Sequence, residues 1–312
     1  MQTLAITGAT GFLGRHLVTE CLLQNRFNLR LLTRKRNAAG LSANDKVTIC
    51  GGDLLEPGRL SDFLSPDCTL IHLAYMNGRG AANIEAIHNI IDVARRAGIK
   101  RVVHCSTAVV VGGSFKGVVD ERTEPEPRDE YQRTKLKIEE VLKSELTPDI
   151  ELAILRPTEI IGPGGAGLAG MIRRMQSDNR FKRFVYHCAL KNRRFNYISV
   201  CNVAAALLFL ATVPDFQNGD IYNISDDDDD DNNYAAVERI ICSCLNIKHD
   251  YTLDIGLPRS LLTRIFKLMP NCSSPDIMYS CDKIKSLGYK KIMKLRSAVS
   301  EIVSAQLCKA NA

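Results

Sequence analysis

The stretch Thr7-Gly8-Ala9-Thr10-Gly11-Phe12-Leu13-Gly14 decides the fold that we expect for this chain. It follows the apolar run Leu4–Thr7, which predicts a strand, and leads into Phe12–Gln24, which has a helical pattern. Its three glycines allow, in order, a tight turn, a close approach of a phosphate to the backbone, and close packing of the helix on the strand. Because free N–H groups at a helix N-terminus bind anions, the stretch predicts a site for the diphosphate of a dinucleotide.

Short apolar runs and helical patterns alternate through the first half of the chain. Further strands are expected over Leu29–Thr33, Val47–Cys50, Thr69–His72, Arg101–Cys105 and Leu152–Leu155. Helices are expected over Gly58–Leu64, Ala81–Ala97 and Tyr131–Leu146. The apolar runs are continuous, as in parallel strands that are covered on both faces. The pattern therefore predicts an α/β fold with a doubly wound parallel sheet of the Rossmann type.

The pattern changes after Arg156-Pro157, where a glycine-rich loop is followed by short strands near Phe195–Ile198 and Ile221–Ile224. We expect a dinucleotide-binding domain over residues 1–165, with a sheet completed by later segments, and a smaller substrate-binding lobe over residues 166–312 that interleaves with it. The aspartate run Asp226–Asp231 lacks the spacing and glycine turn of a calcium loop. It is interpreted as a solvated, mobile loop.

Composition narrows the class of protein. The chain has 312 residues and a formal net charge of +6, but its basic residues are scattered, without the basic stripe or aromatic platform of a nucleic-acid binder. The eleven cysteines are odd in number and form no CxxC pair, which favours reduced thiols over disulfides or a metal site. No signal peptide and no apolar run of about 18 residues occurs. We therefore expect a cytoplasmic protein with a small-molecule substrate.

Two groups of residues point to chemistry. Cys105-Ser106-Thr107 ends the fifth expected strand, where parallel sheets bind ligands. Tyr131 and Lys135 are four residues apart on a helix and so share a face. A nearby ammonium is expected to lower the Tyr131 pKa from its ordinary value of about 10, which makes the phenol a proton donor and acceptor near neutrality.

Other strand ends suggest contacts with the cofactor. Arg34, backed by Lys35 and Arg36, follows the second strand, where an acidic residue would favour NAD. An arginine there pairs instead with a 2′-phosphate and favours NADP, with NAD possible if the cluster is only a basic surface. Asp53 is expected to accept a hydrogen bond from adenine or to cap a helix. The expected cofactor-binding residues are Gly8, Thr10, Gly11, Phe12, Leu13, Gly14, Arg34, Asp53, Leu54, Leu73, Ala74, Lys135 and Pro157.

Together these residues resemble the extended short-chain dehydrogenase/reductases, which include the NAD-dependent epimerases and dehydratases. Residues 7–14 match the TGxxGxxG turn of this group, and Tyr131 and Lys135 match its YxxxK pair. Val110-Val111-Gly112 stands where the group has a VYG-like tripeptide, so Thr107 matches the catalytic hydroxyl. The segment from Arg156 to Gly164 looks like RPxxxYGPG. The similarity runs to about residue 290 and is dense up to Gly164.

The resemblance implies catalytic roles for Thr107, Tyr131 and Lys135. Hydride moves between a substrate carbon and the nicotinamide, Tyr131 passes the proton, Lys135 holds the ribose and Thr107 orients the substrate oxygen. The implied substrate contacts are Thr107, Tyr131, Glu159, Arg193 and Arg194. Dimers are common in this group, which implies a homodimer.

Several functions fit this resemblance. The first is NADPH-dependent reduction of a keto group on a nucleotide-activated sugar, and the nearest alternative is a 4-epimerase or dehydratase that retains NAD. However, Glu159 and Phe195 stand where many epimerases carry Asn and Arg. Asn202-Val203 and the amphipathic segment Leu257–Met269 fit a 3β-hydroxysteroid or terpenoid dehydrogenase. A cofactor-sensing binding protein without activity is the alternative from another class.

Overall fold

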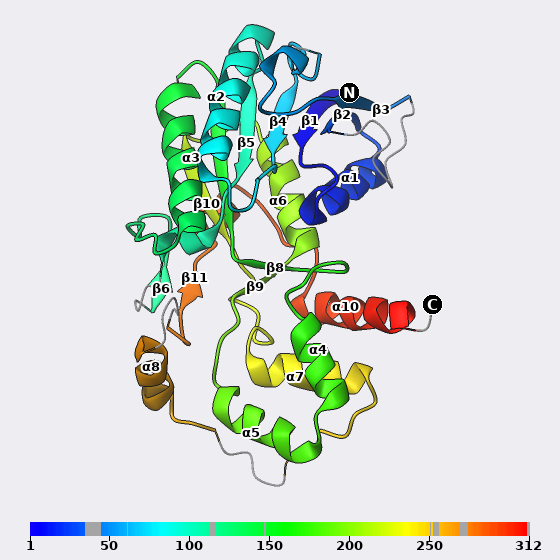
Figure 1. Cartoon of the computed structure of the whole chain (residues 1–312), viewed down its shortest axis with the longest axis vertical. Coiled ribbons are helices and arrows are strands. Elements are labelled where there is room, and N and C mark those ends of the chain that lie inside the picture. Colours follow the sequence, from blue (N-terminus) through cyan, green and yellow to red (C-terminus); the bar gives the residue numbers. More distant parts are fainter. Residues whose placement is uncertain are drawn as a thin grey trace.

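The computed structural model describes residues 1–34, 45–60, 62–112, 117–146, 148–249, 251, 256–268 and 274–310. Figure 1 shows a sheet covered by helices in the upper part of the molecule and a smaller, mostly helical lobe below it. Lys35 and Arg36, which the sequence places behind Arg34, lie outside the described residues.

The large part is built on a seven-stranded sheet in which every paired strand is parallel. The strand order is β10-β7-β5-β4-β1-β2-β3. The strands are β1 (Gln2–Thr7), β2 (Phe27–Thr33), β3 (Val47–Gly51), β4 (Thr69–His72), β5 (Arg101–Cys105), β7 (Glu151–Pro157) and β10 (Asp220–Ile224). The winding reverses between β1 and β4, so the switch point of a doubly wound sheet lies there. The predicted fold class is confirmed.

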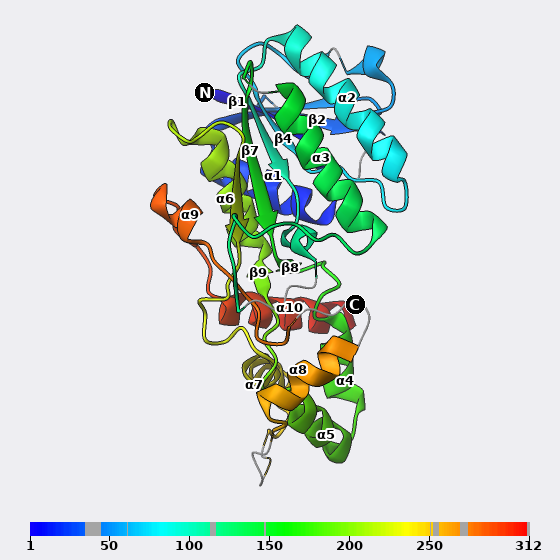
Figure 2. The ribbon, with the colours of Figure 1, turned by 90° about the vertical axis from the view of Figure 1, so that its left-hand side faces the viewer.

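Helices cover both faces of the sheet. On one face α2 (Gly80–Ala97) lies beside α3 (Glu130–Leu146), and on the other α1 (Phe12–Gln24) packs against α6 (Val200–Thr212) (Figure 2). In β1, Leu4 and Ile6 join the core under α1 and α6, whereas Ala5 joins the core under α2 and α3. Because both faces of β1 are buried, its sequence is continuously apolar instead of alternating.

One predicted helix is wrong. The described residues of Gly58–Leu64 form no α-helix: the stretch begins within a 3-10 turn, η1 (Pro57–Arg59), and further turns follow. Leu60, Phe63 and Leu64 are buried in the core under α2. Their apolar spacing therefore arises because an irregular segment is anchored to the core. The sequence alone does not distinguish such a segment from a short helix.

The smaller lobe has its own apolar core, and two short parallel strand pairs lie between it and the large part. The core is shared by α4 (Ala169–Ser177), α7 (Tyr234–Cys244) and α10 (Leu295–Ala310), and α5 (Arg180–Leu190) packs on α7. The strand pairs are β8 (Glu159–Ile161) with β9 (Tyr197–Ser199), and β6 (Val118–Val119) with β11 (Met278–Tyr279). The remaining helices are η2 (Ala108–Val111), α8 (Arg259–Leu268) and α9 (Asp282–Ser286).

The described part of the chain contains no helix that is both long and apolar enough to span a bilayer.

The interpretation of Asp226–Asp231 as a solvated, mobile loop is wrong. Asp226 and Asp227 are 1% and 3% exposed. The Asp227 carboxylate accepts hydrogen bonds from the Tyr279 backbone N–H and the side-chain amides of Asn196 and Asn232, at 2.8, 2.8 and 3.0 Å. Other aspartates of the run pair with Lys285, Lys291 and Arg296. Hydrogen bonds and ion pairs thus connect the run to β9, β11 and the segment before α10, all of which are distant from it in sequence.

We expect Asp227→Ala to lower the free energy of unfolding by about 2–3 kcal/mol, because three buried donors lose their acceptor. Asp230→Ala changes an exposed aspartate of the same run and should shift it by less than about 0.5 kcal/mol. Urea unfolding followed by circular dichroism measures both. Equal stability of the two variants would contradict the structural role of the buried aspartates.

Candidate active site

A cavity of about 680 Å³ runs along the carboxyl ends of the strands at the switch point. It is lined by the turn after β1, by the ends of β2, β4 and β5, and by the N-terminal half of α3. The predicted cofactor-binding residues that line it are Gly8, Thr10, Gly11, Phe12, Leu13, Arg34, Asp53, Leu54, Leu73, Ala74 and Lys135. Gly14 lies beneath the turn, and Pro157 pairs with Ile224 inside the sheet, so neither lines the cavity.

The glycine turn fits a dinucleotide diphosphate. Gly8 has φ +72°, and a Cβ there would lie 2.9 Å from the Ala74 nitrogen. A Cβ on Gly14 would lie 2.1 Å from the Gly8 carbonyl oxygen, so only glycine lets α1 pack this close to the turn. Within the described residues no side chain caps the N-terminus of α1. The first N–H groups of the helix therefore face the cavity and can bind an anion.

Thr7 fixes the loop that follows β4. Its hydroxyl oxygen accepts hydrogen bonds from the backbone N–H groups of Leu73 and Ala74, at 3.2 and 3.3 Å. It also pairs with His72 Nδ1 at 2.8 Å. Burial lowers the His72 pKa to about 3, so this imidazole is neutral and serves as a core hydrogen-bonding group.

Two polar residues flank the far end of the cavity. Arg34 is exposed at the end of β2. Asp53 follows β3, and its carboxylate accepts a hydrogen bond from the Leu55 N–H at 3.0 Å in a tight turn. Asp53 is therefore not a helix cap, since η1 begins later, at Pro57.

Tyr131 lies at the mouth of the cavity, on the first turn of α3. Its hydroxyl makes a side-chain hydrogen bond with Thr107, and 40% of the residue is exposed. Burial raises the Tyr131 pKa to about 12, while the bond to Thr107 acts in the opposite direction. The expected lowering of this pKa is thus wrong for this structure, and the phenol keeps its proton.

Lys135, four residues further along α3, makes its contacts at the end of β5 and with Tyr75. This side chain is 4% exposed, and its ammonium donates a hydrogen bond to the Cys105 carbonyl at 3.0 Å. It also lies 4.8 Å from the centre of the Tyr75 ring, a cation–π contact. Burial lowers the Lys135 pKa. The ammonium is thus held at the strand ends, next to the Tyr75 ring.

Tyr75 is a cavity residue that the sequence analysis missed. Its ring packs edge-on against Tyr131, with ring centres 5.2 Å apart, while Lys135 lies over its face. Tyr75 follows Leu73 and Ala74 after β4. The aromatic side chain at that place is the sequence feature that could have indicated a cavity residue.

A buried network beneath the cavity holds α3 in place. Glu139 and Arg156 form a two-pronged ion pair, with N–O distances of 2.6 and 3.0 Å, and both side chains are 2% exposed. The Ser106 hydroxyl donates to the same carboxylate. The Ser106 hydroxyl is therefore occupied by this network, and the hydroxyl that hydrogen-bonds to Tyr131 is that of Thr107.

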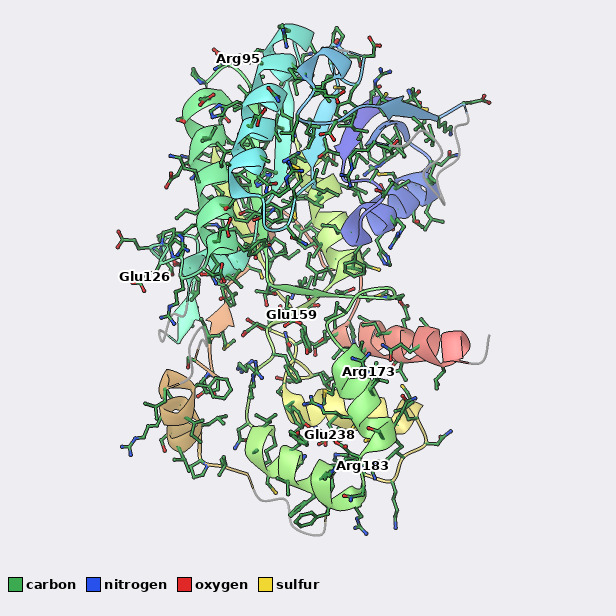
Figure 3. The ribbon with its side chains drawn as sticks, viewed as in Figure 1. Arg95, Glu126, Glu159, Arg173, Arg183 and Glu238 are labelled. Atoms are coloured by element: carbon green, nitrogen blue, oxygen red, sulfur yellow. The ribbon has the colours of Figure 1, made fainter. Side chains whose placement is uncertain are left out.

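The predicted substrate contacts are only partly brought together. Glu159 on β8 lies between the two parts of the molecule (Figure 3), and burial raises its pKa while the Arg193 charge lowers it. The Arg193 guanidinium packs over the Phe195 and Phe266 rings, at 5.7 and 5.2 Å. Arg194 instead donates to the Asp227 carbonyl and lines a different cavity.

A second, smaller cavity of about 300 Å³ lies on the lobe side of Glu159. Phe195, Tyr197 and Arg174 line it. The Arg174 guanidinium packs over the Tyr186 ring, at 5.0 Å from its centre. Its Nε is buried without a hydrogen-bond partner among the described residues.

Comparison with known proteins identifies related sequences. Residues 4–225 match the model of the NAD dependent epimerase/dehydratase family. Sterol demethylase protein B of Methylococcus capsulatus is 31% identical over 173 residues, which are 52% of either chain. Sterol-4-alpha-carboxylate 3-dehydrogenase ERG26, decarboxylating, of Candida albicans is 28% identical over 229 residues, 68% of this chain and 65% of that protein. The chain thus spans between half and two thirds of the length of these relatives.

Solved structures share the whole fold at low identity. Bordetella bronchiseptica WbmG in complex with NAD and UDP has a TM-score of 0.74 at 15% identity, covering 99% of this chain and 96% of that one. RMD from Pseudomonas aeruginosa complexed with NADPH has a TM-score of 0.67 at 20% identity, covering 98% and 99%. At such identities the likeness concerns the fold.

Proposed function

The chain belongs to the NAD dependent epimerase/dehydratase family, and from this premise we propose that it is an NADPH-dependent reductase of a nucleotide-activated sugar. The observation that carries the proposal is the single cavity that contains both the glycine turn and the Tyr131–Lys135 pair. A dinucleotide diphosphate on the N-terminus of α1 would extend along the strand ends toward Tyr131.

The residues supply the acid chemistry. A bound nicotinamide supplies the hydride. Tyr131 donates its proton to the substrate oxygen, since a phenol with an ordinary pKa of about 10 is protonated near neutrality, which is the form that carbonyl reduction needs. Thr107 bonds the same phenol and orients the oxygen. Lys135 places a buried positive charge at the strand ends, where it favours developing negative charge.

The lobe side supports an anionic, ring-bearing substrate. The Arg193 guanidinium packs over the Phe195 and Phe266 rings, and Arg174 lines the second cavity together with Phe195. Guanidinium groups bind phosphates in a two-pronged geometry, and aromatic rings such as that of Phe195 stack on bases or sugars. A nucleotide diphosphate between Glu159 and α4 meets both kinds of group. The related WbmG structure contains UDP, which agrees with this class of ligand.

A sterol-type dehydrogenase is the second candidate. The exposed side of α8 presents Leu261, Ile265 and Leu268, an apolar stripe suited to a hydrophobic substrate or a lipid surface. Two relatives are named for sterol reactions. Asn202, however, does not distinguish the two candidate functions, because its buried side chain forms hydrogen bonds with Asp226 and with the backbone near Met293.

We also propose that the protein forms a homodimer through the exposed side of α3. Light scattering of the purified protein measures the mass of the assembly. The ten cysteines that the structure describes are free thiols, which suits a reducing compartment such as the cytoplasm.

Arg34 sets the cofactor preference in this proposal. We expect the protein to bind NADPH more tightly than NADH, and Arg34→Glu to weaken NADPH binding by about 10- to 100-fold, because a charge-assisted pair with the 2′-phosphate is lost. Arg26→Glu makes the same charge change at the opposite end of β2 and should leave the preference unchanged. Fluorescence titration measures the affinities. NAD that survives purification and is released only by denaturation would favour the epimerase or dehydratase alternative.

Tyr131 is the proton donor in this proposal. We expect Tyr131→Phe to lower turnover of UDP- or dTDP-linked keto sugars by about 10²- to 10⁴-fold while NADPH affinity is kept. Tyr222→Phe removes a phenol on β10, outside the cavity, and should retain turnover. Steady-state kinetics with these sugars and with 3-ketosterols distinguish the two candidates. Turnover of sterols alone would replace the nucleotide-sugar assignment, and full activity of Tyr131→Phe would refute the proposed role.

A further inference from the structure

Three side chains converge in the smaller lobe, away from the cofactor cavity. They are His187 on α5, Glu238 on α7 and His249, which follows α7 in the chain. His187 Nδ1 and His249 Nε2 lie 2.6 and 3.2 Å from the same oxygen, Glu238 Oε2. One candidate ligand atom from each residue lies within 4.8 Å of the others. Glu238 is labelled in Figure 3, where it lies on α7 above α5.

The buried carboxylate of this cluster needs a positive partner, which a protonated imidazole or a bound cation supplies. Glu238 is 0% exposed and His187 is 4% exposed. Among the described residues, the groups that contact this carboxylate are the two imidazoles and the Tyr251 phenol, and no Lys or Arg nitrogen lies within ion-pair distance of it. A buried carboxylate is costly unless a positive charge accompanies it.

The surroundings also suit a metal site. The Tyr251 hydroxyl lies 3.3 Å from Glu238 Oε1, the oxygen turned away from the histidines. The Tyr251 ring packs against both imidazole rings, with centres 4.8 Å apart in each case. Such outer contacts fix the orientation of metal ligands. A cavity of about 590 Å³ lined by His187, His249 and Tyr251 opens onto the cluster and admits an ion and water.

We propose that His187, Glu238 and His249 bind one divalent transition-metal ion, with Zn²⁺ as the best fit. Two imidazoles and one carboxylate, with solvent in the fourth position, are a ligand set that Zn²⁺ accepts. Bonds of about 2.0–2.2 Å in a tetrahedron place ligand atoms about 3.3 Å apart. The observed separations of 2.6 and 3.2 Å therefore need to open by less than an ångström. The candidate ligand atoms of the two histidines, which lie within 4.8 Å of each other, need to close by up to about 1.5 Å. The ion would join α5, α7 and the segment at His249, and this inference is independent of the proposed reaction.

The test uses the full chain after dialysis against EDTA. Calorimetric titration with Zn²⁺ should give one site per chain, and Zn²⁺ should raise the melting temperature. Co²⁺ should give the visible bands of a tetrahedral site without a thiolate-to-cobalt charge-transfer band, which separates this site from the cysteines. His249→Gln should weaken the site by more than about 100-fold, because even outer contacts of a metal site are worth about 10- to 100-fold.

Two further variants sharpen the result. Tyr251→Phe should weaken the site by about 10-fold, as expected for an outer contact. His88→Gln is the matched control, because His88 also pairs with a glutamate, Glu145 at 3.2 Å, but on the exposed side of α2 and α3. It should leave Zn²⁺ binding unchanged. Absence of Zn²⁺ binding to the wild-type chain, or equal binding by His249→Gln, would show that the three residues form only a hydrogen-bonded cluster.

Discussion

The buried ion pair between Glu139 and Arg156 is the interaction on which the candidate site depends. It ties α3 to β7, and the Ser106 hydroxyl ties the same carboxylate to the end of β5. Glu139, Lys135 and Tyr131 are spaced four residues apart, so fixing the first also fixes the face of α3 on which the other two lie. A buried pair of this kind contributes little net stability, but breaking it leaves an unpaired charge. Its value here is in setting the position of α3 relative to the strand ends.

The arrangement of the cavity follows from the position of α3. Lys135 reaches the Cys105 carbonyl at the end of β5 and covers the Tyr75 ring, which in turn packs edge-on against Tyr131. The glycine turn approaches the same space from β1, because the loop after β4 lies too close to Gly8 for a side chain there. The glycine turn and the Tyr131–Lys135 pair thereby lie on one edge of the sheet. The lobe then contributes Arg174, which lines the second, smaller cavity.

The sequence predicted those parts that obey local rules. The glycine turn, the continuous apolar strands and the pair Tyr131–Lys135 each depend on residues that are neighbours in the chain. Features that depend on distant partners were missed or wrong. Asp227 looks solvated in its run of aspartates, yet its partners include Tyr279. The Tyr131 pKa is raised by burial, which the spacing of Tyr131 and Lys135 does not show. The cluster at Glu238 joins three separate segments, so no spacing in the sequence announces it.

Transfer of deuterium from the cofactor to a sugar would show directly whether the protein reduces a nucleotide-activated keto sugar. The protein would be incubated with a UDP- or dTDP-linked 4-keto sugar and NADPH that carries deuterium on the transferred position of the nicotinamide, and the sugar analysed by mass spectrometry. The account predicts one deuterium on the carbon that becomes the alcohol, with transfer strongly slowed in Tyr131→Phe. Tight binding of NADPH without any deuterium in the sugar would contradict it.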